Sequence, residues 1–234
     1  MNGVHNARTF RVENSLISRY DDFYRNEEGI VINNSHRHIF EKGTSPKKVI
    51  VLLHGTGGNE HDLLNIGRHI DSEASLLGVR GNVVEAGMPR YFKRLAEGVF
   101  DEEDLFLRAQ ELYDFLKDSL EHYAPERELV TVVGYSNGAN IAATVMLKHR
   151  SIFDKAILFH AMVPYRNQDM QVLKEATIFV GAGKNDPIIP KNETEELIEV
   201  LRKQGASVFE KWYEFGHQLT MDEVNDAREW YVSK

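Results

Sequence analysis

The 234-residue chain contains no cysteine. This absence excludes a disulfide framework, a thiolate metal site and a cysteine nucleophile, so any chemistry must come from oxygen and nitrogen groups. Basic residues are also not in excess: 28 lysines and arginines stand against 36 acidic residues, and the formal net charge is -8. Because affinity for nucleic acid comes mainly from clustered Lys and Arg, nucleic acid is not an expected partner.

Long apolar runs are missing as well. Residues 1–6 contain no apolar segment typical of a signal peptide, and no stretch approaches the roughly 18 apolar residues of a membrane-spanning helix. We therefore expect a cytoplasmic protein without membrane insertion. The composition, with 42% hydrophobic and 27% charged residues, is that of an ordinary globular protein with one large α/β domain or two small ones.

Short apolar runs alternate with amphipathic stretches along most of the chain. Runs without polar alternation are typical of buried parallel strands, whereas apolar residues at three- and four-residue steps indicate helices. The predicted strands are 49–53, 74–79, 82–86, 129–133, 155–159, 177–180 and 207–215. The predicted helices are 60–70, 101–123, 137–149, 192–204 and 221–231. This alternation predicts an α/β fold, with a mainly parallel sheet covered by helices on both faces.

The first 35 residues differ from the rest because they are polar, rich in asparagine and without a clear helical period. A peripheral strand or hairpin is expected near 30–32 and 38–40. We assign residues 1–35 no role, and we expect the main domain to occupy residues 36–234, with no internal linker.

Residues 134–138 read Gly-Tyr-Ser-Asn-Gly and match the G-x-S-x-G pattern of a nucleophile elbow. They lie between a predicted strand and a predicted helix, which is the context that this motif requires. Such a strained turn lifts a serine hydroxyl above the end of a strand, and its glycines leave room for strand and helix to pass. Ser136 is therefore the candidate nucleophile.

A serine hydroxyl needs a base, usually a histidine that is oriented by a carboxylate. Among ten histidines, His217 follows the last predicted strand and precedes the last helix. Asp186 follows the strand that ends near residue 180, and Pro187 stiffens the turn after it. The order Ser136, Asp186, His217 is that of α/β-hydrolases rather than of the chymotrypsin or subtilisin types.

The segment His54-Gly55-Thr56-Gly57-Gly58 directly follows the predicted strand 49–53. A tetrahedral intermediate needs backbone N–H donors aimed at its oxyanion, and glycines allow the chain to bend accordingly. We assign these donors to the backbone N–H groups of Thr56 and Asn137. His54 is interpreted as a structural brace of this loop rather than as a second base.

Together these motifs resemble the α/β-hydrolase superfamily and, within it, the small phospholipase/carboxylesterase family that borders the dienelactone hydrolases. The tracts 78–82, 87–90 and 134–140 are similar to bacterial carboxylesterases of the hydroquinone-resistance type. The resemblance covers the chain from about residue 38 onward. It implies a compact domain with little or no lid, a Ser-Asp-His triad, no metal or other cofactor, and often a homodimer.

Loops at the carboxyl ends of the strands are expected to select the substrate. The residues expected to form an apolar pocket there are Met88, Tyr91, Phe92, Met162, Val163 and Ile188. Arg90 and Arg94 could bind a substrate carboxylate, although ordinary surface positions are the simpler interpretation. Residues 60–62, Glu-His-Asp, lack the spacing of a metal motif, and a solvated helix start is the simpler interpretation.

The sequence thus predicts a serine carboxylesterase that cleaves small carboxylic esters through an acyl-enzyme. A lysophospholipase, a thioesterase or a dienelactone-type hydrolase remains an alternative, although a cysteine nucleophile would have favoured the last of these. A non-catalytic receptor is a further alternative, but its usual sign is a broken triad. The fold alone does not decide between substrates.

Overall fold

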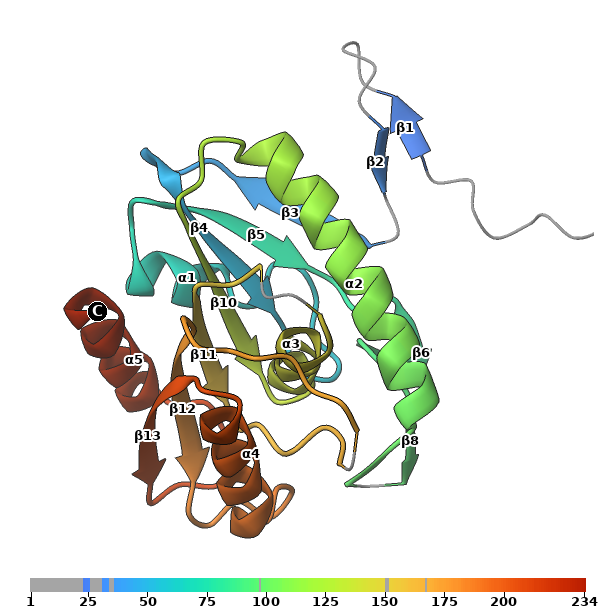
Figure 1. Cartoon of the computed structure of the whole chain (residues 1–234), viewed down its shortest axis with the longest axis vertical. Coiled ribbons are helices and arrows are strands. Elements are labelled where there is room, and N and C mark those ends of the chain that lie inside the picture. Colours follow the sequence, from blue (N-terminus) through green and yellow to red (C-terminus); the bar gives the residue numbers. More distant parts are fainter. Residues whose placement is uncertain (1–22, 26–30, 34–35, 97, 150–151, 167) are drawn as a thin grey trace, which may run out of the picture.

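A seven-stranded sheet crosses the centre of the computed structural model (Figure 1). The structure describes residues 23–25, 31–33, 36–96, 98–149, 152–166 and 168–234. In spatial order the strands are β13 (Ser207–Tyr213), β12 (Thr177–Gly183), β11 (Lys155–Phe159), β10 (Leu129–Tyr135), β4 (Ser45–Leu53), β5 (Ala74–Val79) and β3 (His38–Glu41). Every neighbouring pair is parallel except β3 and β5. The predicted parallel sheet is confirmed.

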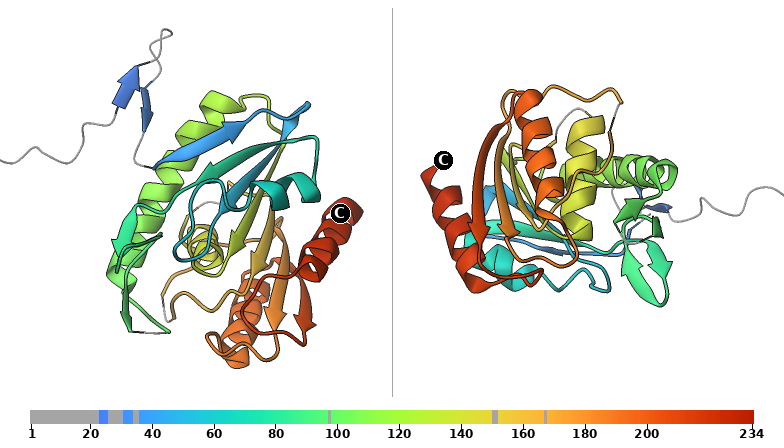
Figure 2. Two further views of the ribbon diagram at one scale, coloured as in Figure 1. Left: turned by 180° about the vertical axis from the view of Figure 1, so that it is seen from behind. Right: turned by 90° about the horizontal axis from the view of Figure 1, so that it is seen from below.

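Helices cover both faces of this sheet, as Figure 2 shows from two further directions. The helices on one face are α2 (Glu102–Tyr123), α3 (Asn137–Lys148) and α4 (Lys191–Lys203), and their apolar side chains share one buried cluster with the strands. Those on the other face are α1 (Leu64–Ile70) and α5 (Met221–Ser233), which belong to a second cluster. In the described part of the chain, no helix is both long and apolar enough to cross a membrane.

The local sequence explains where these elements begin and how deep they lie. All six residues of β5 are buried, as expected for a strand covered on both faces, whereas the edge strand β13 alternates between exposed and half-buried residues before Tyr213. Asp101 caps α2 by accepting a hydrogen bond from the Asp104 amide. At the start of α5, Thr220 and Glu223 form a reciprocal capping box.

Two regions differ from the sequence-based expectations. The predicted strand 82–86 forms as β6 (Val83–Glu85), but it pairs with β7 (Met88–Arg90) outside the main sheet. A second small hairpin, β8 (Arg94–Ala96) with β9 (Val99–Phe100), follows it. Helix α1 begins at Leu64 rather than at residue 60, because residues 60–63 form turns.

The two expected N-terminal strands do not pair with each other. β3 pairs antiparallel with β5 at the edge of the main sheet. β2 (Val31–Asn33) instead pairs with β1 (Phe23–Arg25), and the remaining residues of 1–35 lie outside the described part of the chain.

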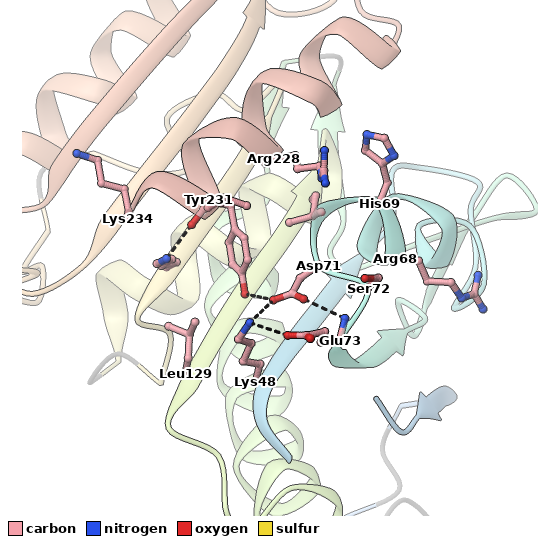
Figure 3. Close-up of a pocket in the computed structure, with 13 residues that line it drawn as sticks. Lys48, Arg68, His69, Asp71, Ser72, Glu73, Leu129, Arg228, Tyr231 and Lys234 are labelled. Carbon is pink, nitrogen blue, oxygen red and sulfur yellow. Dashed lines mark hydrogen bonds and ion pairs between the residues drawn. The ribbon is translucent and has the colours of Figure 1, made fainter. Parts of the chain in front are cut away.

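Polar side chains join three elements at the amino ends of the strands (Figure 3). Asp71, which ends α1, lies 3.0 Å from the ammonium of Lys48 on β4 and accepts a hydrogen bond from Tyr231 of α5. Burial opposes ionisation of Asp71, but the Glu73 amide and these two partners outweigh it and lower the pKa of the carboxyl. The network therefore fastens α1 and α5 to the sheet at the end opposite Ser136.

Candidate active site

Ser136 occupies a strained turn between β10 and α3. Its backbone has φ 52° and ψ -113°, a conformation that non-glycine residues rarely adopt. The turn is crowded: a Cβ at Gly138 would lie 2.0 Å from the carbonyl oxygen of Leu53, and one at Gly134 would lie 2.6 Å from Cα of Ala139. Only glycine fits at these two positions, so the strand and the helix can cross closely enough to expose the Ser136 side chain.

This crowding predicts that Gly138→Ala destabilises the protein strongly. The added methyl group meets backbone rather than a flexible side chain, so we expect a loss of about 3 kcal/mol or more in the free energy of unfolding, measured by urea denaturation. Gly216→Ala is the matched control, since its Cβ would meet the nearest atoms at 3.5 Å. Equal stability losses in the two variants would contradict the steric account of the elbow.

The structure brings Ser136, His217 and Asp186 together. Nε2 of His217 lies 2.9 Å from Oγ of Ser136, and its Nδ1 lies 2.7 Å from Oδ2 of Asp186. Asp186 follows β12 and His217 follows β13, so three parallel strands deliver the three side chains to the same edge of the sheet. This is the edge at which open α/β sheets bind their ligands.

The surroundings of Asp186 stabilise its ionised carboxylate, which accepts hydrogen bonds. Its Oδ1 accepts hydrogen bonds from the amides of Ile188 at 2.8 Å and Ile189 at 3.0 Å, and its side chain is 3% exposed. Burial alone would favour the neutral acid, but the two amides and the His217 ring outweigh it, so the pKa of Asp186 is lowered. An ionised Asp186 favours the His217 tautomer that carries its proton on Nδ1, and Nε2 then faces Oγ of Ser136 with its lone pair.

Thr56 and Asn137 line the same pocket as Ser136 and His217. His54 braces the loop that carries Thr56: its Nδ1 lies 2.6 Å from the Gly55 carbonyl oxygen, and its Nε2 lies 3.0 Å from the Gly81 amide nitrogen. Burial lowers the pKa of His54. A neutral ring that donates from Nδ1 to Gly55 and accepts at Nε2 from the Gly81 amide satisfies both contacts, which is consistent with a structural role for His54.

The pocket beside Ser136 has a volume of about 290 Å³. Of the six residues expected to form it, Met162 and Ile188 line it. A larger hollow of about 710 Å³, drawn in Figure 3, lies at the opposite end of the sheet, away from the Ser136 side chain. We therefore take the smaller pocket as the candidate substrate site.

The remaining four pocket expectations need correction. Tyr91, Phe92 and Val163 are at most 1% exposed and belong to the hydrophobic core. The Tyr91 hydroxyl also donates a hydrogen bond to the Val79 carbonyl and accepts one from the His54 amide. It therefore stabilises the start of the loop that carries Thr56. Met88 is 40% exposed on β7 and does not line the pocket. Apolar residues after a strand can thus fill the core under the loop instead of facing the ligand.

Arg90 is not a surface residue. Its side chain is 4% exposed, lines the pocket and forms an ion pair with Glu85. Arg94, which is exposed, also lines the pocket and pairs with the same carboxylate at 3.1 Å. Nε of Arg90 has no hydrogen-bond partner among the described residues. Two cations sharing one carboxylate leave this side of the pocket with an excess positive charge.

Several polar residues of the site were not identified from the sequence. The Tyr135 hydroxyl donates a hydrogen bond to the His217 carbonyl at 2.7 Å, which fixes the loop of the histidine. His160 contacts Asp186, and Glu223 contacts His160. The Thr-x-x-Glu spacing of 220–223 indicates a helix start from sequence alone, but nothing in the sequence indicates that its glutamate is buried.

Glu60 also corrects an expectation, because it is 3% exposed and pairs with Arg37 and Arg80 instead of lying in solvent. Within the described ranges, the three residues whose ligand-type atoms cluster within 4.8 Å are His160, Asp186 and His217. Nδ1 of His217 and Nδ1 of His160 lie 2.7 and 3.2 Å from Oδ2 of Asp186, which are hydrogen-bond distances for a ring N–H group and a carboxylate.

Comparison with known proteins agrees with the fold. The sequence profile of the Dienelactone hydrolase family matches residues 37–230. The chain is 54% identical over 195 residues to the hydrolase MhqD of Bacillus subtilis (strain 168), covering 83% of this chain and 97% of that protein.

Solved structures of related proteins have the same fold. The carboxylesterase of Bacillus cereus superposes with a TM-score of 0.83 at 49% identity, covering 86% of this chain and 95% of the other. YahD, solved with malic acid, superposes with a TM-score of 0.79 at 31% identity, covering 85% of this chain and 98% of the other.

Proposed function

We propose that this chain, which belongs to the dienelactone hydrolase family and is a carboxylic ester hydrolase, uses Ser136 as the nucleophile that cleaves small esters. The observation that carries the proposal is the continuous contact from Ser136 Oγ through His217 to Asp186, at 2.9 and 2.7 Å. These are the distances at which a base can take the serine proton.

In the proposed reaction, Ser136 Oγ attacks the ester carbonyl while Nε2 of His217 takes its proton. The imidazolium that forms is stabilised by Asp186 through Nδ1. The backbone N–H groups of Thr56 and Asn137 bind the oxyanion, and each such donor contributes about 2.7–4 kcal/mol of transition-state stabilisation. His217 then protonates the leaving alcohol, and a water molecule repeats the sequence to release the acid. No cofactor takes part.

The pocket volume of about 290 Å³ favours short acyl groups. Hydrolysis of p-nitrophenyl esters of increasing acyl length tests this, and we expect kcat/KM to peak at short chains. A peak at long chains would instead favour a lysophospholipase or thioesterase. Family membership alone does not favour a dienelactone substrate, because the chain has no cysteine nucleophile. A folded protein without any hydrolysis would favour the receptor alternative.

The excess positive charge beside the pocket predicts a preference for esters that carry a carboxylate. YahD was solved with malic acid, a dicarboxylic acid, which supports this choice. We expect Arg90→Met to lower kcat/KM for p-nitrophenyl hemisuccinate about 10-fold or more relative to p-nitrophenyl butyrate. Glu85→Gln should change the same ratio in the opposite direction, because it frees both Arg90 and Arg94. A ratio that is unchanged in both variants would contradict the preference.

Assembly, location and domain limits stay predictions. We expect a cytoplasmic homodimer, for which light scattering coupled to size-exclusion chromatography gives the direct measurement. We also keep the division into an N-terminal extension of unknown role (1–35) and a hydrolase domain (36–234), which the family match to 37–230 supports.

A further inference from the structure

His160 contacts Asp186 and His217, two of the three proposed catalytic residues. It follows β11, has a left-handed backbone with φ 52°, and is 1% exposed. Its amide donates a hydrogen bond to the Gly181 carbonyl at 2.8 Å, so the strained backbone is held by the neighbouring strand. Backbone strain at a non-glycine residue persists only where the surroundings enforce it, and it is found mainly at functional sites.

The His160 ring stands between two carboxylates. Nδ1 lies 3.2 Å from Oδ2 of Asp186, the oxygen that also accepts from His217. Nε2 lies 2.9 Å from Oε1 of Glu223, at ion-pair distance but without the alignment of a hydrogen bond. The rings of Tyr135 and His217 pack edge-on against the same imidazole. In the part of the chain that the structure describes, these four side chains are the titratable groups in contact with His160.

This environment favours protons on both ring nitrogens. A neutral imidazole would direct a lone pair at one of the two carboxylates, whereas an imidazolium donates from Nδ1 to Asp186 and places its positive charge at ion-pair distance, 2.9 Å, from Oε1 of Glu223. Burial opposes the charge, but Glu223 and then Asp186 outweigh it, so the pKa of His160 is raised.

Glu223 does more than cap its helix. Its Oε2 accepts from the amide and the hydroxyl of Thr220, at 2.8 and 2.9 Å, which completes the capping box. A cap needs only that oxygen, yet the whole residue is 0% exposed and Oε1 faces His160. Burying a carboxylate is unfavourable unless a partner compensates for the lost hydration, and His160 is that partner.

We propose that His160 and Glu223 are positioning residues that orient Asp186. Together with Asp186 they give a net charge of minus one beside the His217 ring. The His160 cation fixes Oδ2 of Asp186 and cancels one carboxylate charge, and Glu223 supplies the second carboxylate. The contact with His160 thus fixes the Asp186 carboxylate, and Asp186 can still stabilise the His217 imidazolium. This inference rests on the proposed serine-esterase function.

The charge balance makes the pH profile the decisive measurement, because the acid limb of kcat/KM reports the protonation of the essential base. His160→Gln leaves two carboxylates behind His217, so the limb should move to higher pH by about one unit. Adding Glu223→Gln removes the surplus charge while an amide keeps the helix cap, and the limb of the double variant should return to the wild-type position. Glu229→Gln, an exposed position on the same helix, is the control without a shift.

Imidazole NMR of the whole protein gives a second readout that needs no substrate. The wild-type His160 ring should carry both protons throughout the range in which activity develops, and Glu223→Gln should lower its titration midpoint by about one unit or more. A neutral His160 ring, or identical acid limbs in the wild type, His160→Gln and the double variant, would overturn the proposal. A wild type that hydrolyses no ester would instead contradict the proposed function itself.

Discussion

Ser136→Ala is expected to lower kcat/KM for p-nitrophenyl esters by about 10⁶-fold, the largest effect of any single substitution in this chain. The variant keeps the elbow, the oxyanion loop and His217, but no oxygen remains 2.9 Å from Nε2 to attack the carbonyl. The residual rate should come from binding and oxyanion stabilisation alone, about 10³- to 10⁴-fold above water.

Ser72→Ala is the matched control for this loss, because Ser72 is exposed and lies at the opposite end of the sheet. Its rate should equal that of the wild type. If Ser136→Ala folds normally and retains more than a few per cent of the activity, another group is the nucleophile and the proposed mechanism is wrong.

Asp186→Asn should lower kcat by about 10⁴-fold while the fold persists. The amides of Ile188 and Ile189 hold the side-chain oxygen, so the new NH₂ group faces His217. It then stabilises the tautomer with its proton on Nε2, which cannot accept the proton of Ser136. Stopped-flow measurement of acylation gives this loss directly.

Asp118→Asn, at an exposed site on α2, is the control that should leave the rate unchanged. Because the pKa of Asp186 is lowered, its carboxylate remains ionised at the pH where a free aspartate side chain would become protonated. Protonation of Asp186 should therefore not reduce wild-type activity at that pH. Only a small effect of Asp186→Asn would contradict the orienting role.

Much of the fold was predictable because its signals are local. β5 and β11 have the bounds that their apolar runs predicted, since strands buried on both faces carry no polar alternation. The positions of Ser136, Asp186 and His217 followed from the same logic. In a parallel sheet, residues that follow different strands meet at one edge, even when they are far apart along the chain.

The remainder left no clear local signal in the sequence. Nothing local distinguishes Phe92, which fills the core, from Ile188, which lines the pocket, because both are apolar residues in loops. The burial of Glu223 depends on His160, which is far away in the sequence. Arg90 pairs with the nearby Glu85, but no local pattern shows that Arg90 is buried. The small hairpins β6–β7 and β8–β9 are likewise defined by pairing across turns rather than by long periodic runs.

Covalent labelling tests the central claim most directly. Incubation of the wild-type protein with a fluorophosphonate, followed by peptide mapping with mass spectrometry, should place the phosphonyl group on Ser136 alone, and His217→Ala should slow the labelling because the base is missing. An unlabelled Ser136 in a folded protein, or a label on another residue with Ser136 unmodified, would contradict the assignment of Ser136 as the nucleophile.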